Sequence, residues 1–381
     1  MHRILLAILL FCNSIAFAGD PISVGIFNGA NYTRVTVTIL TGQYILKIDG
    51  DEVTTISAGQ SADVSVATGK LTAIVQGKEY KSSQKIIFQS SGYCEFKVQA
   101  AGQKANGRIY SENLHLFATG GRLQLVNRID VENYVPGVIE AEGGGDHEIE
   151  YYKVQAIISR TYALNNLRRH EAEGFSVCDG THCQVYHGRP RHEPLARKAT
   201  EATEDIVIVD DNIDLITAAF HSNCGGHTVN AEDVWSKPLS YCVARPDSFC
   251  TMMPHSHWEK SMPSTQWYEY IQSKKNPVTD STGAIAYVPN KRSLYLVDSS
   301  FVIPTRTIRQ DLKLRSAYFT VHDQGEQVKL MGQGFGHGVG LCQEGAMRMA
   351  VLGYTYKDII HYYYKGVHLV PRRLIWFFKE D

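Results

Sequence analysis

The feature that most restricts the fold is a series of short β-branched segments between residues 22 and 124, separated by glycine-containing turns. Several of them alternate apolar with polar residues, which predicts strands with one buried face. The region contains few nucleophiles or histidines. We therefore expect residues 19–124 to form a β-rich support or docking region. Its clearest strand segments are Val35–Leu40, Tyr44–Ile48, Leu71–Val75 and Leu114–Leu116.

Helical patterns follow in the second part of the chain. Apolar residues recur at helical spacing in Glu150–Leu167, and acidic residues near its start complement the helix dipole. Two more helices are predicted at Gln343–Leu352 and Tyr356–Tyr364, and mixed strands and loops are expected between Ile206 and Val339. The predicted fold class is α+β, with the β-rich region followed by a mixed α+β domain at residues 125–381.

The N-terminus has the pattern of an export signal. The basic Met1–Arg3 segment precedes the apolar run Ile4–Phe11, and Ala16–Ala18 provides an A-x-A cleavage site. A membrane anchor, the alternative, needs about 20 apolar residues and fits less well. We expect residues 1–18 to be a signal peptide and the mature protein to reach the periplasm or cell envelope.

Net charge and cysteine content limit the classes of partner and ligand that we expect for this chain. The chain has 38 basic and 39 acidic residues, so it gives no support for a nucleic-acid partner. Without Cys12, seven cysteines remain, and an odd number means that at least one is free or binds metal. Disulfides stay open as an alternative, because exported proteins tolerate them.

Three common active-site motifs are missing from the sequence. There is no HExxH and no G-x-S-x-G, and the glycine-rich segment 334–340 does not satisfy G-x-G-x-x-G. A zincin, a serine hydrolase and a Rossmann enzyme are therefore disfavoured. What remains is a carboxylate, Glu142, at the end of an apolar segment and directly before Gly143, Gly144 and Gly145. Glycines permit close backbone approach at the floor of a cleft. By itself, a carboxylate there is more typical of a surface or capping residue.

Five motifs, taken in order, resemble the stage II sporulation protein D family, which includes the amidase-enhancer (LytB) proteins. The resemblance extends over most of the chain from Ile22. The motifs are Tyr134–Glu142, with Tyr-x-Pro-Gly ahead of the acid; Gln155–Ala163; Thr181–Tyr186; Phe220–Gly226 with Glu232–Trp235; and Gly336–Ala346.

This resemblance implies a lytic transglycosylase that cleaves peptidoglycan glycan strands after N-acetylmuramic acid, leaving 1,6-anhydro ends. The catalytic glutamate of the family falls on Glu142, and Glu140 is the weaker candidate. Gly143-Gly144 replaces the Met-Pro that usually follows this glutamate, which bears on the shape of the loop. One acid/base suffices for the reaction, with a pKa expected near 6. Substrate-binding candidates from the motifs are Arg160, Tyr162, Gln184, Tyr186, His221, Ser222, His337 and Gln343.

Structural roles are the alternative for these polar residues. Arg160 can tie down a loop, and His337 can satisfy backbone groups in its glycine turn. At the level of the whole protein, the alternative is an amidase enhancer that binds glycan, or a cell-wall amidase, without catalysis. A purely scaffolding role has no motif in its favour.

A second constellation consists of His170, Cys178, His182 and Cys183. Two thiols and two imidazoles suit a closed tetrahedral zinc site, and some members of the family bind zinc with a similar cluster. Others lack it, so any zinc here is expected to be structural. A disulfide between Cys178 and Cys183 is the alternative, as are pairs with Cys224, Cys242, Cys250 or Cys342. His187 and His221 are alternative ligands, and His170 is the least secure of the four.

Overall fold

The computed structural model describes residues 21–102, 107–191, 194–235, 237–274, 286–289, 292–298 and 301–375. The expected signal segment, residues 1–18, lies outside these ranges. Within them, no helix is both long and apolar enough to cross a membrane.

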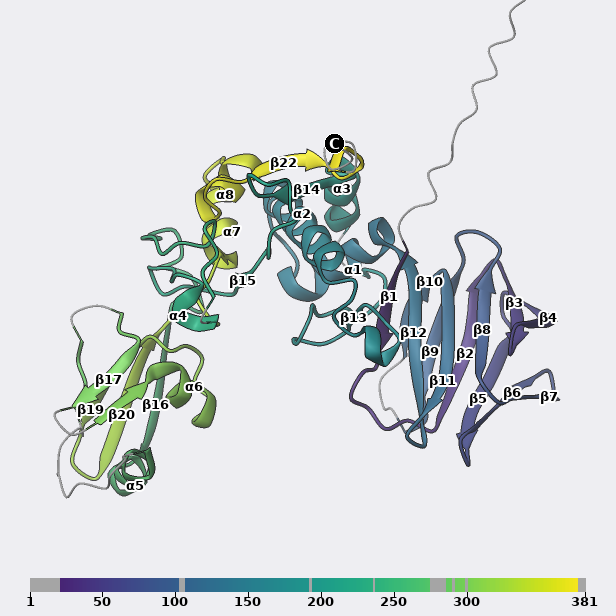
Figure 1. The fold of residues 1–381 in the computed structure, drawn as a ribbon, viewed down its shortest axis with the longest axis horizontal. Helices are drawn as coiled ribbons and strands as arrows, with labels where there is room; N and C mark the ends of the chain where they lie inside the picture. Colours follow the sequence, from purple (N-terminus) through teal and green to yellow (C-terminus); the bar gives the residue numbers. More distant parts are fainter. Residues whose placement is uncertain are drawn as a thin grey trace, which may run out of the picture.

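Two β-sheets pack face to face at the N-terminal end of the chain, drawn in purple and blue in Figure 1. The first sheet has seven strands, in the spatial order β13 (Val177–Cys178), β1 (Pro21–Ile26), β12 (Arg122–Asp130), β11 (Asn113–Thr119), β8 (Lys85–Ser90), β3 (Gln43–Ile48) and β4 (Asp51–Ser57). The second has six, in the order β10 (Arg108–Ser111), β9 (Glu95–Ala100), β2 (Arg34–Thr41), β5 (Ser61–Ala67), β6 (Lys70–Val75) and β7 (Lys78–Ser82).

Apolar side chains at every second position of the strands point inward and form the core between the two sheets. Strand β2 buries Val35, Val37 and Ile39, while the residues between them are partly exposed. Across the core, the rings of Tyr44 and Phe96 meet edge to face with centroids 5.7 Å apart. The four strand segments expected from the sequence correspond to β2, β3, β6 and β11. The boundary expected at residue 124 falls inside β12, so the sandwich continues to Asp130.

A helical layer follows the sandwich. Its helices are α1 (Val131–Gly143), α2 (Ile149–Asn165), α3 (Pro194–Ala202), α7 (Gln343–Val351) and α8 (Tyr356–Tyr363). The expected helices at 150–167, 343–352 and 356–364 are confirmed as α2, α7 and α8. The side chains of Thr355 and Asp358 form a capping box at the start of α8.

Two short ladders hold distant segments against this layer. Strand β14 (Ile206–Val209) pairs antiparallel with β22 (His368–Pro371), and β15 (Phe220–His221) pairs parallel with β21 (Leu341–Cys342). The second ladder places His221 beside Cys342, which are 121 residues apart in the sequence. Residues from two of the expected motifs are therefore neighbours in space.

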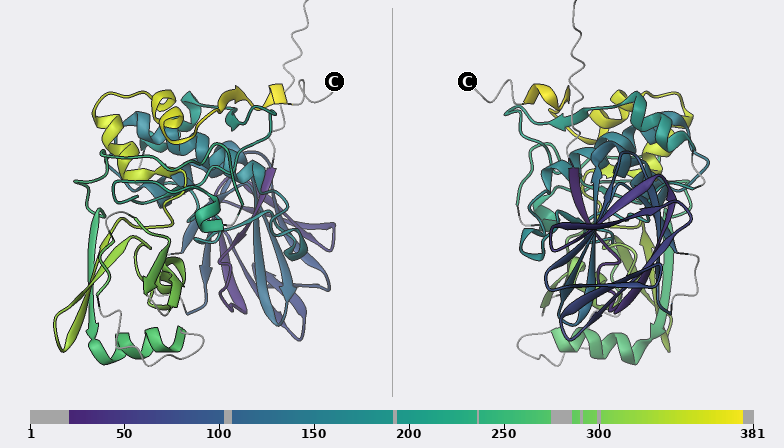
Figure 2. Two further views of the ribbon diagram at one scale, coloured as in Figure 1. Left: turned by 60° about the vertical axis from the view of Figure 1, so that its left-hand side comes forward. Right: turned by 90° about the vertical axis from the view of Figure 1, so that its right-hand side faces the viewer.

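A small α+β unit occupies the other end of the molecule, drawn in green in Figures 1 and 2. It has its own apolar core, which includes Trp258, Trp267 and Leu330. A single helical turn, α4 (Glu232–Trp235), precedes it. Its elements are β16 (His257–Pro263), α5 (Ser264–Lys274), β17 (Tyr295–Asp298), β18 (Phe301–Pro304), α6 (Thr305–Asp311), β19 (Phe319–Asp323) and β20 (Gln327–Gln333).

Candidate active site

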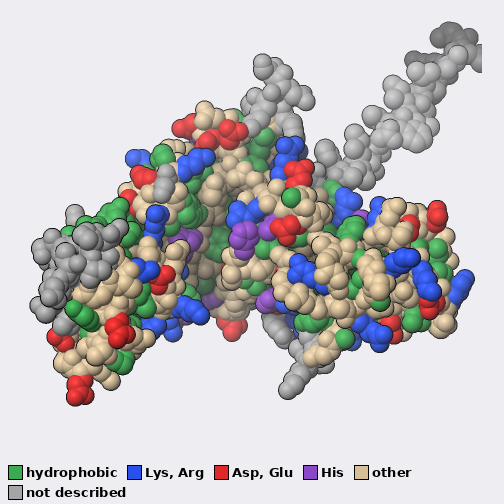
Figure 3. Space-filling view, turned by 60° about the horizontal axis from the view of Figure 1, so that its bottom comes forward, with side chains coloured by type: hydrophobic (Ala, Val, Ile, Leu, Met, Phe, Trp, Pro, Cys, Tyr) green, Lys and Arg blue, Asp and Glu red, His purple; other side chains and the backbone are tan. Residues whose placement is uncertain are grey.

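A cleft of about 610 Å³ lies where the helical layer meets the segments around β15 and β21. In the view of Figure 3, histidine side chains lie around the recessed middle of the molecule, between its two ends. The polar side chains that line the cleft belong to Glu142, Tyr162, Arg169, Thr181, His182, Cys183, Thr217, His221, Ser222, Trp235, Arg309, His337 and Gln343. Among these lining residues, Glu142 is the only one with a carboxylate.

Glu142 stands on the last turn of α1 and is partly buried. Its Oε1 accepts a 2.7 Å hydrogen bond from the backbone N–H of Val185. Burial raises the pKa of Glu142 above its usual value, and this hydrogen bond opposes the shift in part. The Gln343 side-chain amide donates to the Glu142 carbonyl at 3.3 Å, which ties the start of α7 to the end of α1.

The Tyr-x-Pro-Gly motif positions the segment that contacts this carboxylate. A Cβ on Gly137 would lie 2.1 Å from the carbonyl oxygen of Gly188, so only glycine permits this backbone approach. The rings of Tyr134 and Tyr186 pack with centroids 4.7 Å apart. The Tyr134 hydroxyl also donates to the side-chain carbonyl of Gln184 at 3.3 Å. The motif therefore holds residues 184–188 against α1, which brings Val185 to the catalytic candidate.

Gln184 and Tyr186 are fully buried and do not line the cleft. The Tyr186 hydroxyl donates to the Asn127 side chain at 3.2 Å. In this structure, both side chains support the cleft from behind.

Two neutral histidines lie together in the cleft. His221 is 4% exposed, and burial followed by the proximity of His337 lowers its pKa well below the usual value. Its Nδ1 lies 3.1 Å from the Val339 carbonyl, so Nδ1 carries the proton and Nε2 is an acceptor. Within the described chain, that Nε2 has no hydrogen-bond partner.

His337 lies with its ring 5.4 Å from that of His221. Burial lowers the pKa of His337 to about 4. Its Nδ1 accepts from the backbone N–H of Val339 at 3.0 Å. This contact agrees with the alternative in which His337 satisfies backbone groups of its own glycine turn. Tyr162, Ser222 and Gln343 complete the set of expected polar residues that the structure brings into the cleft.

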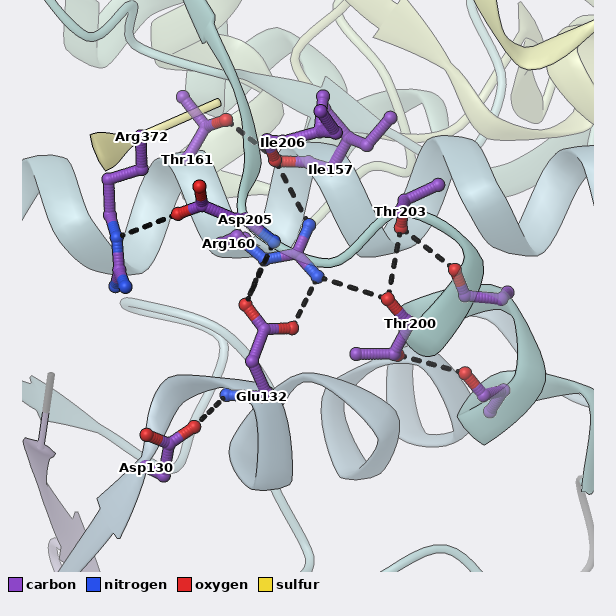
Figure 4. Close-up of polar contacts among 12 residues, drawn as sticks. Asp130, Glu132, Ile157, Arg160, Thr161, Thr200, Thr203, Asp205, Ile206 and Arg372 are labelled. Carbon is purple, nitrogen blue, oxygen red and sulfur yellow. Dashed lines mark hydrogen bonds and ion pairs between the residues drawn. The ribbon is translucent and has the colours of Figure 1, made fainter. Parts of the chain in front are cut away.

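Arg160, another expected substrate-binding residue, does not line the cleft. Its side chain is fully buried and forms a two-pronged ion pair with Glu132, at 2.7 and 2.5 Å (Figure 4). It also donates to the carbonyls of Ile206 and Thr200, so it joins α1 to the end of α3 and the start of β14. These contacts match the alternative in which the helix arginine ties down a loop.

The four metal-ligand candidates come together at one edge of the cleft. The nearest nitrogen or sulfur atoms of His170, Cys178, His182 and Cys183 all lie within 4.8 Å of one another. His170 Nε2 is 3.3 Å from Cys183 Sγ, and His182 Nδ1 is 3.8 and 3.7 Å from the two sulfurs. Ligands of one tetrahedral zinc are separated by roughly 3.4–3.8 Å, given bond lengths of about 2.0–2.3 Å.

Some residues at the site were not anticipated from the sequence. Glu173 contacts His170 Nδ1 at 2.5 Å, an arrangement common behind metal-binding imidazoles. Arg309 and Trp235 line the cleft, the former from the small α+β unit. Trp235 belongs to a recognised motif, but nothing in the sequence marks Arg309, because helix α6 is distant in the chain and carries no motif.

Comparison with known proteins gives consistent matches. The family model described as "Stage II sporulation protein" (SpoIID) matches residues 119–209, which include Glu142 and the metal-ligand candidates. An uncharacterized protein of Brachyspira hyodysenteriae is 27% identical over 361 residues, covering 91% of this chain and 95% of that protein. Stage II sporulation protein D of Bacillus subtilis is 28% identical, covering 65% and 76%. The amidase enhancer of Bacillus subtilis is 28% identical, covering 61% of this chain and 40% of that protein.

Proposed function

Because this chain belongs to the SpoIID/LytB family, whose members serve the cell wall, we propose that it is a peptidoglycan lytic transglycosylase with Glu142 as its acid/base. The observation that carries the proposal is a single carboxylate of raised pKa in a cleft whose other polar lining groups are neutral or cationic. A raised pKa increases the protonated fraction of Glu142 at a given pH, which favours its use as a general acid.

The proposed reaction uses Glu142 twice. Its protonated carboxyl donates to the glycosidic oxygen after N-acetylmuramic acid, and the bond from C1 to that oxygen breaks. The C6 hydroxyl of the same sugar then bonds to C1 and gives its proton to the Glu142 carboxylate. The products are a 1,6-anhydro end and a new 4-hydroxyl end, and the enzyme is regenerated. An inverting hydrolase would need a second carboxylate to activate water.

The rest of the cleft supports binding and the charge that develops on the sugar. The unpaired Nε2 of His221 is an acceptor for a sugar hydroxyl. Arg169 and Arg309 are cationic groups for carboxylates of the muramic acid or its peptide. Tyr162, Ser222, His337 and Gln343 are the remaining proposed contacts.

The product decides between this proposal and its main alternative. Purified glycan strands, with and without peptide stems, should yield 1,6-anhydromuramic ends detectable by mass spectrometry. Reducing ends alone would reject the lytic mechanism. No cleavage of either substrate, together with stimulation of a purified cell-wall amidase, would favour the amidase-enhancer function suggested by the similarity to that protein. Action on peptidoglycan also requires export, which secretion of a reporter fused to residues 1–18 would test.

We also propose that His170, Cys178, His182 and Cys183 bind a structural zinc. The donor set fills all four positions, so the ion leaves none for a reactive water. It would fasten the 168–188 segment, which carries Val185, to the edge of the sandwich through β13. Glu173→Gln should weaken zinc binding by about 10–100-fold, because the carboxylate orients His170. Glu171→Gln is the neighbouring control, and equal zinc affinity in the two variants would reject the role of Glu173.

A further inference from the structure

A second group of metal-ligating side chains lies outside the cleft. Cys224, Asp247, Cys250 and Cys342 each place one sulfur or oxygen atom within 4.8 Å of the other three. All four residues are at most 1% exposed. Their side chains come from the loop after β15, the turn at residues 246–250 and the strand β21.

The spacing of these atoms suits a single tetrahedral ion. Cys224 Sγ lies 3.3 Å from Cys250 Sγ and 3.3 Å from Asp247 Oδ2. Sulfur and oxygen ligands of one zinc are separated by roughly 3.5–3.8 Å, given bonds of about 2.0–2.3 Å, so these atoms need to move apart by only a few tenths of an ångström to hold one ion. A disulfide would require about 2.05 Å between the sulfurs, and all of these cysteines are free thiols in this structure.

The surroundings orient the ligands as in a metal centre. The backbone N–H of Cys224 donates to Cys342 Sγ at 3.3 Å. The Tyr363 hydroxyl donates to Asp247 Oδ2 at 2.9 Å, and the N–H of Phe249 donates to Oδ1 at 3.0 Å. Outer hydrogen bonds of this kind fix the direction of first-layer ligands. The Asp247-x-x-Cys250 spacing also matches the two-residue gap of paired zinc ligands.

Glycine makes room for this arrangement. A Cβ on Gly345 would lie 2.6 Å from Asp247 Oδ2 and 2.0 Å from the Tyr363 hydroxyl. Because residue 345 is a glycine, helix α7 can lie this close to the Asp247 carboxylate. Any residue with a Cβ at this position would clash. A fully buried carboxylate beside three thiols is costly without a compensating cation.

We propose that Cys224, Asp247, Cys250 and Cys342 form a second zinc site, with three sulfur ligands and one oxygen ligand. Four protein ligands close the coordination sphere, so the role is structural. The ion fastens together three segments separated by up to 118 residues. Two of them carry cleft residues, because Ser222 precedes Cys224 by two positions and Gln343 follows Cys342 directly. This site is independent of the proposed activity and of the His170 cluster.

Metal content separates the two sites without any activity assay. Untagged full-length protein should contain about two equivalents of zinc by elemental analysis. Cys183→Ser and Cys250→Ser should each lose about one equivalent. Cys242→Ser is the matched control, because Cys242 is a buried cysteine outside both clusters and its variant should keep the wild-type content. Zinc in Cys250→Ser equal to wild type would overturn the proposal, as would a Cys224–Cys250 disulfide in peptide mapping of the wild type.

Cobalt substitution covers the case in which Cys250→Ser does not fold. In the Cys183→Ser background, bound Co²⁺ should show the thiolate-to-metal absorption of three sulfur ligands. Adding Asp247→Cys should retain the ion and strengthen that absorption by about one third, for four sulfurs in place of three. Absence of the band in folded Cys183→Ser protein, or no change with the added cysteine, would reject the site.

Discussion

The backbone N–H of Val185 donates a 2.7 Å hydrogen bond to the carboxylate of Glu142, across 43 residues of sequence. This bond favours the charged form, while burial favours the neutral one and prevails. The contact therefore orients the carboxyl group, while burial keeps its pKa raised. Residues 184–188 therefore position the proposed acid/base, even though Gln184 and Tyr186 are buried behind the cleft.

Replacing Glu142 by glutamine should abolish most of the activity. The amide keeps the shape of the side chain but cannot donate and accept the proton in turn, so glycan cleavage should fall by at least about 10²-fold. The measurement is the initial rate of anhydro-end formation from purified strands. Glu140→Gln is the control, because Glu140 accepts from the Arg191 backbone and does not line the cleft. Equal loss in both variants would remove Glu142 from its assigned role.

The same substitution should stabilise the fold at neutral pH. The folded-state pKa of Glu142 is raised, so ionisation destabilises the folded protein as pH rises from about 4, the unfolded pKa, through the folded value. Glutamine stays neutral throughout. The free energy of unfolding of Glu142→Gln should exceed that of wild type at pH 7, and the difference should vanish below about pH 4. Urea unfolding across this range is the test, and a variant less stable at pH 7 would contradict the raised pKa.

Arg160 should prove to be a stability residue. Arg160→Met leaves the Glu132 carboxylate without its partner, and breaking such a buried pair costs about 3–5 kcal/mol. Glu132 is partly exposed, so we expect the lower end, measured by urea unfolding. In the double variant with Glu132→Gln the loss should be smaller than the sum of the single losses. A large fall in kcat/KM with unchanged stability would instead assign Arg160 to substrate binding.

Local patterns predicted much of the fold. Strand alternation identified β2, β3, β6 and β11, and helical spacing with capping residues identified α2, α7 and α8. Helix α1 was not predicted, because Pro136 and Gly137 are unfavourable inside a helix. Tertiary packing against Gly188 overrides that preference. Burial is likewise invisible in a motif, so Arg160 and Tyr162 look equivalent in sequence although only Tyr162 reaches the cleft.

The two metal-ligand clusters differ in how far sequence spacing could predict them. His170, Cys178, His182 and Cys183 lie within 14 residues, so their spacing alone suggested a shared ion. Cys224 and Cys342 are 118 residues apart and meet only because β15 pairs with β21. Sequence spacing carries no information about such a pairing.

Gly137→Ala should disable the site without touching the cleft. The added Cβ would lie 2.1 Å from the Gly188 carbonyl oxygen and 2.8 Å from the Tyr186 ring, so the backbone of residues 184–188 must move away from α1. Overpacking of this kind costs about 1–3 kcal/mol of stability. The displacement should also lengthen or break the bond from Val185 to Glu142, which leaves the carboxyl free to rotate and lowers the rate of cleavage.

Hydrogen exchange at the Val185 amide links the two effects of Gly137→Ala. Protection of that amide should fall together with activity, while α8, which lies elsewhere in the helical layer, keeps its protection. Gly180→Ala is the matched control, since a Cβ at Gly180 meets no atom within 4 Å and should change neither property. Wild-type activity in Gly137→Ala with lost Val185 protection would show that the hydrogen bond is dispensable. Retained protection with lost activity would show that Gly137 acts by another route.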